Sequence, residues 1–406
     1  PAGFAGRTND PYLLKFPMAQ GCTMCGHCYQ GCMLPRQAPR NLKAKRSVYN
    51  SYVPMALTTD LWCHGKAATL LDDAFVTGIL TENLPSGLKA TGVKFRRGAT
   101  NEELTETARV VVMACGAVET PRLWLNSGLP NPNGWVGKGL TNHATDVVVG
   151  IMPFDTKSSM GPASAVRADF PGRGSLENFG GMPGTQAALA FLGSEAGIAG
   201  MYDNGAPADE SGADLTGRLV GPLLKEAMSN IDRLLNIVTL TDDDVDPRNS
   251  VSLSAIQPPD ENGPVPLVTT PSANFSARTR SNREFLAKKA VDILRGAGAT
   301  KVIRAKAPPS LIHMHSTMRM GSDANTSVLD ESGEARAVKG LFVADNSALA
   351  NAIGGPNPTL TTQALATRTA EKIFTRYFGG DGWVRRELPV SSIDPRITAA
   401  CIKRGL

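Results

Sequence analysis

Two of the five histidines in this 406-residue chain lie in one short run, His313-Met-His-Ser-Thr-Met-Arg-Met-Gly321. Oxidation of an alcohol needs a base that takes the hydroxyl proton while a hydride leaves the carbon. Histidine suits this task because its unperturbed pKa lies near neutrality. The run therefore indicates a candidate catalytic base, and the chemistry alone leaves both His313 and His315 open.

A second group of reactive side chains lies near the start of the chain, in the spacing C-x2-C-x2-C-x3-C. Its members are Cys22, Cys25, Cys28 and Cys32. Bacterial ferredoxins space their ligands in this way, although Met33 replaces the proline that usually follows. Thiolates this close can surround an iron–sulfur cluster. Zinc, with His27 as a substitute ligand, and a structural role without metal are the alternatives.

A strand, a glycine turn and a helix are predicted between residues 110 and 127. The run Val110-Val-Val-Met-Ala-Cys115 is apolar throughout, which suits a strand buried on both faces. Gly116 makes the turn, and Glu119 to Ser127 predict a helix with Pro121 near its start. Together these elements form half of a nucleotide-binding unit.

A further strand and helix are predicted towards the C-terminus. Gly340-Leu-Phe-Val-Ala-Asp345 predicts a short buried strand that ends in an acid, at the edge where parallel sheets bind ligands. Asn357 followed by Pro358 predicts an N-cap and the start of a helix that runs to about Tyr377. Asp345 alone is equally well explained as a turn or cap acid. The helix N-terminus can stabilise an anion such as a reduced flavin.

The middle of the chain has weaker patterns. Short β-like runs occupy residues 67–112, and residues 146–152 predict another strand. Residues 156–217 are rich in Gly, Ser, Pro and Ala and predict mainly loop. Helical patterns return at residues 219–235 and 283–296.

Composition describes an ordinary globular chain with one large core or two domains, because 42% of its residues are apolar and 19% are charged. The net charge of +5 gives little support to nucleic-acid binding. No apolar run approaches the ~18 residues that span a bilayer, and no secretory signal precedes the first strand. The chain begins with Pro1, so we expect processing or a longer product. The compartment stays open, with the periplasm or a membrane reached through a partner as alternatives.

Several blocks, read in order, resemble the glucose–methanol–choline oxidoreductases over roughly residues 20–377. The run from Gly116 to Leu129 is similar to the second signature of that family, with Trp124 and Pro130 as departures. The segment His313 to Gly321 resembles "HxxGTxRMG", with Ser316 in place of the usual glycine. Further similar blocks are Val136-Gly-Lys-Gly-Leu-Thr-Asn-His143, Asp246-Pro-Arg-Asn-Ser-Val-Ser-Leu253 and Gly355-Pro-Asn-Pro-Thr-Leu-Thr361.

This resemblance implies FAD-dependent oxidation of an alcohol or sugar hydroxyl to a carbonyl. It matches His313 to the catalytic histidine of the family, which takes the hydroxyl proton while hydride passes to flavin N5. It matches Asn357 to the second catalytic position, which holds the developing alkoxide. The residues matched to positions near the flavin are Gly116, Ala117, Thr120, Asp345, Asn346, Pro358 and Thr359.

One feature of the family is not found in these residues. The family opens with a strand, G-x-G-x-x-G and a helix that hold the adenosine diphosphate half of FAD. That segment is expected on a second chain, or was lost or not included, or the protein has abandoned FAD. The alternative function is therefore a non-catalytic subunit or binding module that retains the scaffold without flavin. Retention of both His313 and Asn357 favours the enzyme.

The cysteines also resemble one dehydrogenase branch of the family, whose C-x5-C-x3-C spacing holds a three-iron cluster. Cys22, Cys28 and Cys32 match that spacing, and Cys25 is extra. This implies a [3Fe-4S] cluster, with [4Fe-4S] as the alternative, and electron transfer to a cytochrome or quinone partner. Absence of a cluster would favour an oxidase.

The predicted fold class is α/β, with an incomplete FAD-binding (Rossmann-like) domain and an α+β substrate domain that contains an antiparallel sheet. Residues 20–143 form part of the FAD-binding domain with the cysteine-rich segment, and residues 144–310 form the substrate domain. Residues 311–378 complete the FAD-binding part with the catalytic residues, and residues 379–406 are a tail. A small alcohol or sugar substrate is expected to contact residues 156–245.

Overall fold

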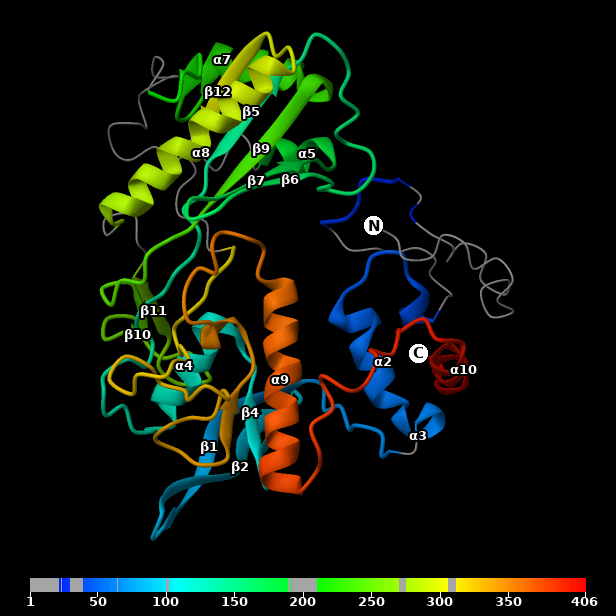
Figure 1. Ribbon diagram of the computed structural model, residues 1–406, viewed down its shortest axis with the longest axis vertical. Helices are drawn as coiled ribbons and strands as arrows, with labels where there is room; N and C mark the ends of the chain where they lie inside the picture. Colours follow the sequence, from blue (N-terminus) through cyan, green and yellow to red (C-terminus); the bar gives the residue numbers. More distant parts are fainter. Residues whose placement is uncertain are drawn as a thin grey trace.

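The computed structural model describes residues 22, 24–29, 39–63, 65–99, 102–188, 191, 210–269, 275–305 and 312–406. Figure 1 shows an upper part built around one broad sheet, a lower part around smaller sheets and the long helix α9, and a helical group beside them. This mixed architecture confirms the α/β class expected from the sequence.

The lower part contains a parallel pair of strands from distant parts of the chain. Strand β4 (Val111–Met113) pairs with β13 (Leu341–Val343), with Leu341 opposite Val111. Helices α4 (Gly116–Asn126) and α9 (Thr359–Phe378) follow these two strands. Strands from residues 20–143 and 311–378 thus lie side by side in one parallel pair.

Two expectations for β4 and its helix were wrong. The strand is shorter than predicted, since it pairs with β13 over Val111–Met113 only, and Val112 is 45% exposed. Cys115, expected to be a buried strand residue, is exposed and lies beyond the strand. Helix α4 begins at Gly116, so Pro121 lies inside the helix and not at its start.

An antiparallel sheet in the order β1-β2-β3 packs beside this pair, as the β-like runs predicted. Its strands are β1 (Ala74–Leu84), β2 (Gly87–Arg97) and β3 (Glu102–Thr107). One apolar cluster joins β1, α4, β4 and β13, with Trp124 completely buried at its centre. A short hairpin, β10 (Ser250–Leu253) with β11 (Pro266–Thr269), contacts α4.

The upper part is a six-stranded sheet in the order β6-β7-β9-β5-β12-β8. All neighbours are antiparallel except β12 and β8. Its strands are β5 (Val147–Ile151), β6 (Arg167–Phe170), β7 (Gly174–Phe179), β8 (Leu215–Thr216), β9 (Leu234–Thr241) and β12 (Lys301–Ala305). The short helices α5 (Pro183–Ala187) and α7 (Gly221–Ser229) adjoin it.

The sequence described this region poorly outside β5. The expected loop at residues 156–217 contains the hairpin β6–β7, and the helical pattern predicted at residues 219–235 ends at Ser229 and gives way to β9. Helix α8 (Ala277–Gly296) starts earlier than predicted, because the Ser276 side chain accepts a hydrogen bond from the Thr279 amide and caps it. Its buried face packs against the sheet through Leu286, Ala290, Val291 and Leu294.

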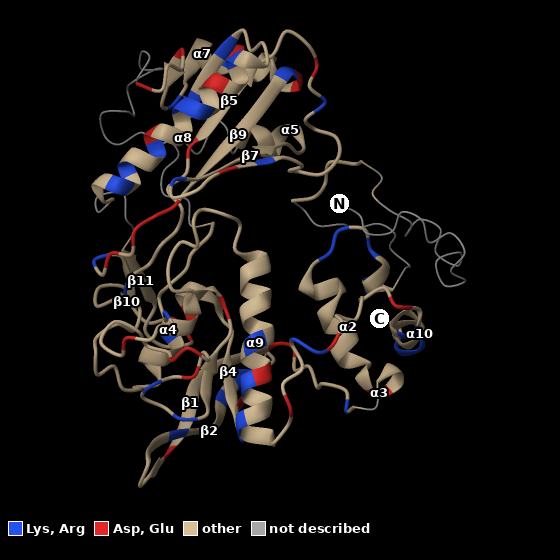
Figure 2. Ribbon diagram, in the orientation of Figure 1, with Lys and Arg blue, Asp and Glu red and all other residues tan. Residues whose placement is uncertain are grey.

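The helical group joins both ends of the described chain. Helices α2 (Tyr52–Leu57) and α3 (Thr59–Trp62) contact α10 (Pro395–Arg404), which lies in the expected tail. Along α8 and α9, basic residues are interspersed with acidic ones (Figure 2), so neither helix presents charges of one sign. No helix in the described ranges is both long and apolar enough to cross a membrane.

Candidate active site

The imidazole rings of His143, His313 and His315 lie close together. The rings of His143 and His313 are nearly perpendicular with centroids 5.2 Å apart, and those of His143 and His315 are 5.1 Å apart. The His313 and His315 centroids are separated by 6.5 Å. His143 ends one of the family-like blocks but was not predicted to belong to the site.

His143 ties this cluster to two other segments. It is completely buried, with Nδ1 2.8 Å from the carbonyl oxygen of Thr241 and Nε2 3.2 Å from that of Pro356. A neutral imidazole donates through one nitrogen only, so it satisfies one carbonyl at a time. Burial lowers the pKa of His143 despite the nearby Asp243 carboxyl. Its contacts bring strand β9 and the loop before α9 beside His313.

The two candidate bases differ in accessibility. His315 is completely buried, and its Nδ1 lies 3.4 Å from the Thr141 hydroxyl, whereas His313 is only partly buried. Burial, assisted by the neighbouring imidazole of His143, lowers the pKa of His313 to about 4 and that of His315 to about 3. Both rings are therefore neutral near pH 7 and able to accept a proton. His313 Nδ1 and His315 Nε2 have no hydrogen-bond partner among the described residues.

These pKa values predict a stability change on acidification. His315 stays neutral in the folded, flavin-free protein down to about pH 3, whereas the unfolded chain protonates it near the ordinary pKa of 6.5. Below pH 6.5 the unfolded state therefore binds more protons, and the free energy of unfolding falls by up to about 1.4 kcal/mol per pH unit for this residue. Urea unfolding at several pH values should show a shallower decline for His315→Asn than for the unaltered protein. Parallel declines would contradict the shift.

The catalytic run is fastened to α4 by Thr317. Because Pro121 has no N–H group, the Ala117 carbonyl four residues before it lacks its helical donor. The Thr317 hydroxyl donates to this carbonyl at 2.7 Å. Proline inside the helix therefore creates the acceptor that holds the run. Ser316 has a positive φ of 74°, which explains why the family usually has glycine at this position.

Three predicted cofactor residues form one hydrogen-bonded group. Asp345 Oδ2 accepts from the Gly116 amide at 3.0 Å and from the Thr120 hydroxyl at 2.6 Å. Its other oxygen accepts from the Ser347 amide at 2.7 Å, so Asp345 also serves as a cap, the alternative that the sequence left open. The carboxyl thus joins the end of β13 to the N-terminus of α4. Asn346 accepts from the Thr362 hydroxyl and so contacts α9.

Asn357 was predicted to be the N-cap of α9, and this prediction is wrong. Pro358 already has helical dihedral angles and is the N-cap, without a side-chain bond. The Asn357 amide instead donates from Nδ2 to Glu177 Oε1 on β7 at 2.6 Å. The preceding loop is held to the same strand by a bond of 3.0 Å from the Ser175 hydroxyl to the Gly355 carbonyl. Glu177 was missed because its segment was expected to be loop.

The cysteine segment lies against the upper part. Cys22 and Cys25 are exposed, Cys28 is partly buried with Sγ 3.7 Å from the Gly161 carbonyl, and Cys32 lies outside the residues that the structure describes. No group of three or more potential metal ligands is found within the described ranges. The four-cysteine ligand set therefore stays a prediction.

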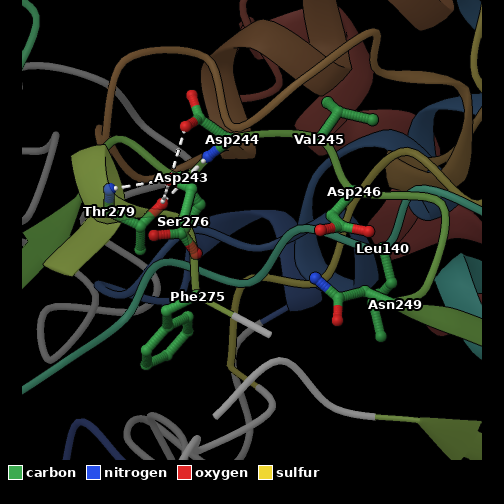
Figure 3. Close-up of a pocket in the computed structure, with 9 residues that line it drawn as sticks. All are labelled: Leu140, Asp243, Asp244, Val245, Asp246, Asn249, Phe275, Ser276 and Thr279. Carbon is green, nitrogen blue, oxygen red and sulfur yellow. Dashed lines mark hydrogen bonds between the residues drawn. The ribbon is translucent and has the colours of Figure 1, made fainter. Parts of the chain in front are cut away.

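A cavity of about 420 Å³ lies next to the start of α8 (Figure 3). Its carboxylates already have partners, since Asp244 accepts from the Ser276 hydroxyl at 2.5 Å and from Arg278 at 2.7 Å. Neither His313 nor Asn357 lines it. The cavity is bounded by Leu140, Asp243, Asp244, Val245, Asp246, Asn249, Phe275, Ser276 and Thr279. We therefore keep the histidine cluster as the candidate active site.

Comparison with known proteins gives two family matches, both described as GMC oxidoreductase, over residues 18–145 and 248–366. The chain is 28% identical over 311 residues to paromamine 6'-oxidase of Streptomyces fradiae, covering 72% of this chain and 50% of that protein. It is 30% identical over 311 residues to 2-methyl-1,2-propanediol dehydrogenase of Mycolicibacterium austroafricanum, covering 71% and 52%. A solved pyridoxine 4-oxidase from Mesorbium loti aligns with a TM-score of 0.48 and 16% identity, over 78% of this chain and 59% of that one. The chain spans about half the length of the two curated relatives.

Proposed function

Since the chain belongs to the GMC oxidoreductase family, we propose that it oxidises an alcohol or sugar hydroxyl to a carbonyl with FAD, and that His313 is the base. The observation that carries this proposal is the role of His143, which contacts both the His313 ring and the carbonyl of Pro356, the residue before Asn357. Both predicted catalytic positions are thereby attached to one buried imidazole. The names of the two curated relatives, which refer to paromamine and to a propanediol, support a hydroxyl substrate.

His313 and Asn357 have different roles in the proposed reaction. His313 is neutral near pH 7, because burial lowers its pKa to about 4, and it takes the proton from the substrate hydroxyl. One Nδ2 hydrogen of Asn357 is engaged by Glu177, and the second donates to the oxygen as negative charge develops there. Bound FAD would accept the hydride from the carbon.

The chain's own residues fit the ring end of FAD. Thr359 is exposed and Leu360 is 80% exposed at the N-terminus of α9, where unpaired amides favour an anion. A Cβ atom placed on Gly116 would meet no atom within 4 Å, so the start of α4 leaves room for a close ligand. We assign the flavin contacts to Gly116, Ala117, Thr120, Asp345, Asn346, Pro358 and Thr359.

We also propose that a nucleotide-binding segment outside these 406 residues, on a second chain, covers β4 and α9 and holds the rest of FAD. Thr369 is the one buried residue of the 20-residue helix α9, and Phe374 and Phe378 are 43% and 52% exposed. Val112 on β4 is similarly exposed. Large apolar side chains on neighbouring elements favour a covering partner. Residues 20–143 and 311–378 would then be the FAD-binding part, and residues 144–310 the substrate part.

Product formation tests the proposed function. The flavin-loaded protein should convert at least one class among primary alcohols, secondary alcohols and sugars to a carbonyl when an electron-accepting dye is supplied. Comparison of dye with oxygen as the acceptor separates a dehydrogenase from an oxidase. If no class yields a carbonyl although flavin is bound, the proposed function is wrong.

We further propose that this is a dehydrogenase in which Cys22, Cys25, Cys28 and Cys32 hold an iron–sulfur cluster that passes electrons to a cytochrome or quinone. Cys22, Cys25 and Cys28 are free cysteines that form no disulfide bond. Their segment lies beside the substrate sheet, since a Cβ atom on Gly181 would come within 3.2 Å of the Tyr29 ring. The cluster would therefore lie close to the strand that bonds Asn357.

Cys28→Ser should reduce the iron content of the purified protein to background, because a serine hydroxyl is a poor ligand for this soft cluster. Iron is measured by metal analysis alongside flavin content, which should not change. Cys63→Ser is the matched control, since Cys63 is exposed and outside the cysteine segment. Iron retained in Cys28→Ser, or absent from the unaltered protein, would refute the ligand assignment.

A further inference from the structure

We propose that Glu177 gives the active site a preference for alcohols that carry a positively charged amino group close to the oxidised hydroxyl. This inference rests on the proposed oxidation at His313 and Asn357. It extends that function by naming the class of substrate, which is an amino alcohol or amino sugar.

The position of Glu177 is fixed by the sheet. It lies in the middle of β7 and pairs with Arg167 on β6 and Val238 on β9. Ser175, two residues earlier on the same face, donates to the Gly355 carbonyl, so this face is turned towards the loop before α9. The Glu177 side chain therefore points at the segment that carries Asn357, and its residue is only 8% exposed.

The carboxyl group of Glu177 forms no salt bridge in the part of the chain that the structure describes, and Arg167, its neighbour on β6, is paired with Asp169. The side-chain hydrogen bond of Glu177 comes from the Asn357 amide, at 2.6 Å. Asp146 differs from Glu177 in this respect, because its buried carboxylate is paired with both Arg283 and Arg304 at 2.6 Å. A buried carboxylate without a cation is costly, and a cationic ligand relieves that cost. An ammonium group on the substrate supplies such a cation.

The same geometry sets where the ammonium group lies. Asn357 uses one Nδ2 hydrogen for Glu177 and has the second for the reacting oxygen, so the two acceptors are about 5 Å apart. An amino group that reaches Glu177 must then be within a few bonds of the hydroxyl. Tyr29 lies near the end of β7, since a Cβ atom placed on Gly181 would come within 3.2 Å of the Tyr29 ring. Its ring can add a cation–π contact to the same ammonium group.

Glucosamine and glucose are suitable probes, because they differ in one amino group. We expect the flavin-loaded protein to bind glucosamine at least about tenfold more tightly than glucose at slightly acidic pH, as hydrogen bonds to charged groups imply. Ligand-observed NMR titration measures both affinities without turnover. Glu177→Gln should abolish the preference. Glu226→Gln, at an exposed ion pair on α7, should retain it.

Glu177→Asp is the second variant, because it keeps the charge and should keep a preference for glucosamine even if the amide contact lengthens. Circular dichroism checks that each variant is folded. Equal affinity for the two sugars in the unaltered protein, or an undiminished preference in folded Glu177→Gln, would overturn the proposal. The titrations are independent of catalysis, so a failure of carbonyl formation overturns the proposed function without deciding the charge preference.

Discussion

His313→Ala is expected to abolish alcohol oxidation while the flavin stays bound. The substitution removes the base and leaves the hydroxyl proton without an acceptor, and a positioned general base contributes roughly 10²–10⁴-fold to the rate. Nδ1 of His313 has no hydrogen-bond partner among the described residues, so the loss of this ring should not disturb the cluster greatly. The rate of carbonyl formation and the flavin content, measured on the same preparation, provide the test.

His315→Asn is the informative comparison for this experiment. His315 is completely buried, and its Nδ1 faces Thr141, so it should affect the rate less than His313 does. Near-normal turnover in His313→Ala would refute the assigned base. A selective loss in His315→Asn would transfer the role to the second histidine, the choice that chemistry alone left open.

Asp146→Ala is expected to cost about 3–5 kcal/mol of unfolding free energy, the cost of breaking a buried ion pair. Asp146 and Arg304 are both completely buried, and Oδ2 of Asp146 accepts from Arg304 at 2.6 Å while Oδ1 accepts from Arg283. Removing the carboxylate leaves two guanidinium groups with one carboxylate, Glu284, beside Arg304. Urea-induced unfolding measures the change.

The control is Asp169→Ala, which removes an exposed ion pair with Arg167 on the same sheet. Exposed pairs contribute about 0–1 kcal/mol, because water screens them. A loss for Asp146→Ala as small as that for Asp169→Ala would show that the buried network is not needed for the substrate sheet.

Elements with a strong local signal were predicted well. The apolar run before Asp345 forms β13, and residues 146–152 contain β5, because continuous apolar residues suit a buried strand in either sheet. Strand β7 was missed because it contains Gly174, Ser175, Glu177 and Asn178, whose local preferences favour loops. Pairing with β6 and β9 overrides those preferences, and no local pattern reports such pairing.

In the candidate site, too, local sequence rules predicted less than the long-range contacts determine. Asn357 and Pro358 satisfy a local capping rule, yet Glu177, 180 residues away, takes the amide. Pro121 satisfies the rule for a helix start, yet it lies inside α4 because Thr317 supplies the missing donor. His143 makes its contacts across 98 and 213 residues. The family resemblance selected His313 and Asn357, but the residues that hold them depend on these long-range contacts.

The visible absorption spectrum of the purified protein, recorded before and after anaerobic addition of alcohols, tests the central claim most directly. We expect flavin bands that bleach when an alcohol is added, because His313 can take the hydroxyl proton as the bound FAD is reduced. A broad iron–sulfur shoulder beneath the bands would support the dehydrogenase assignment. A colourless protein, or flavin bands that no alcohol bleaches, would contradict the account and favour a scaffold that has lost the reaction.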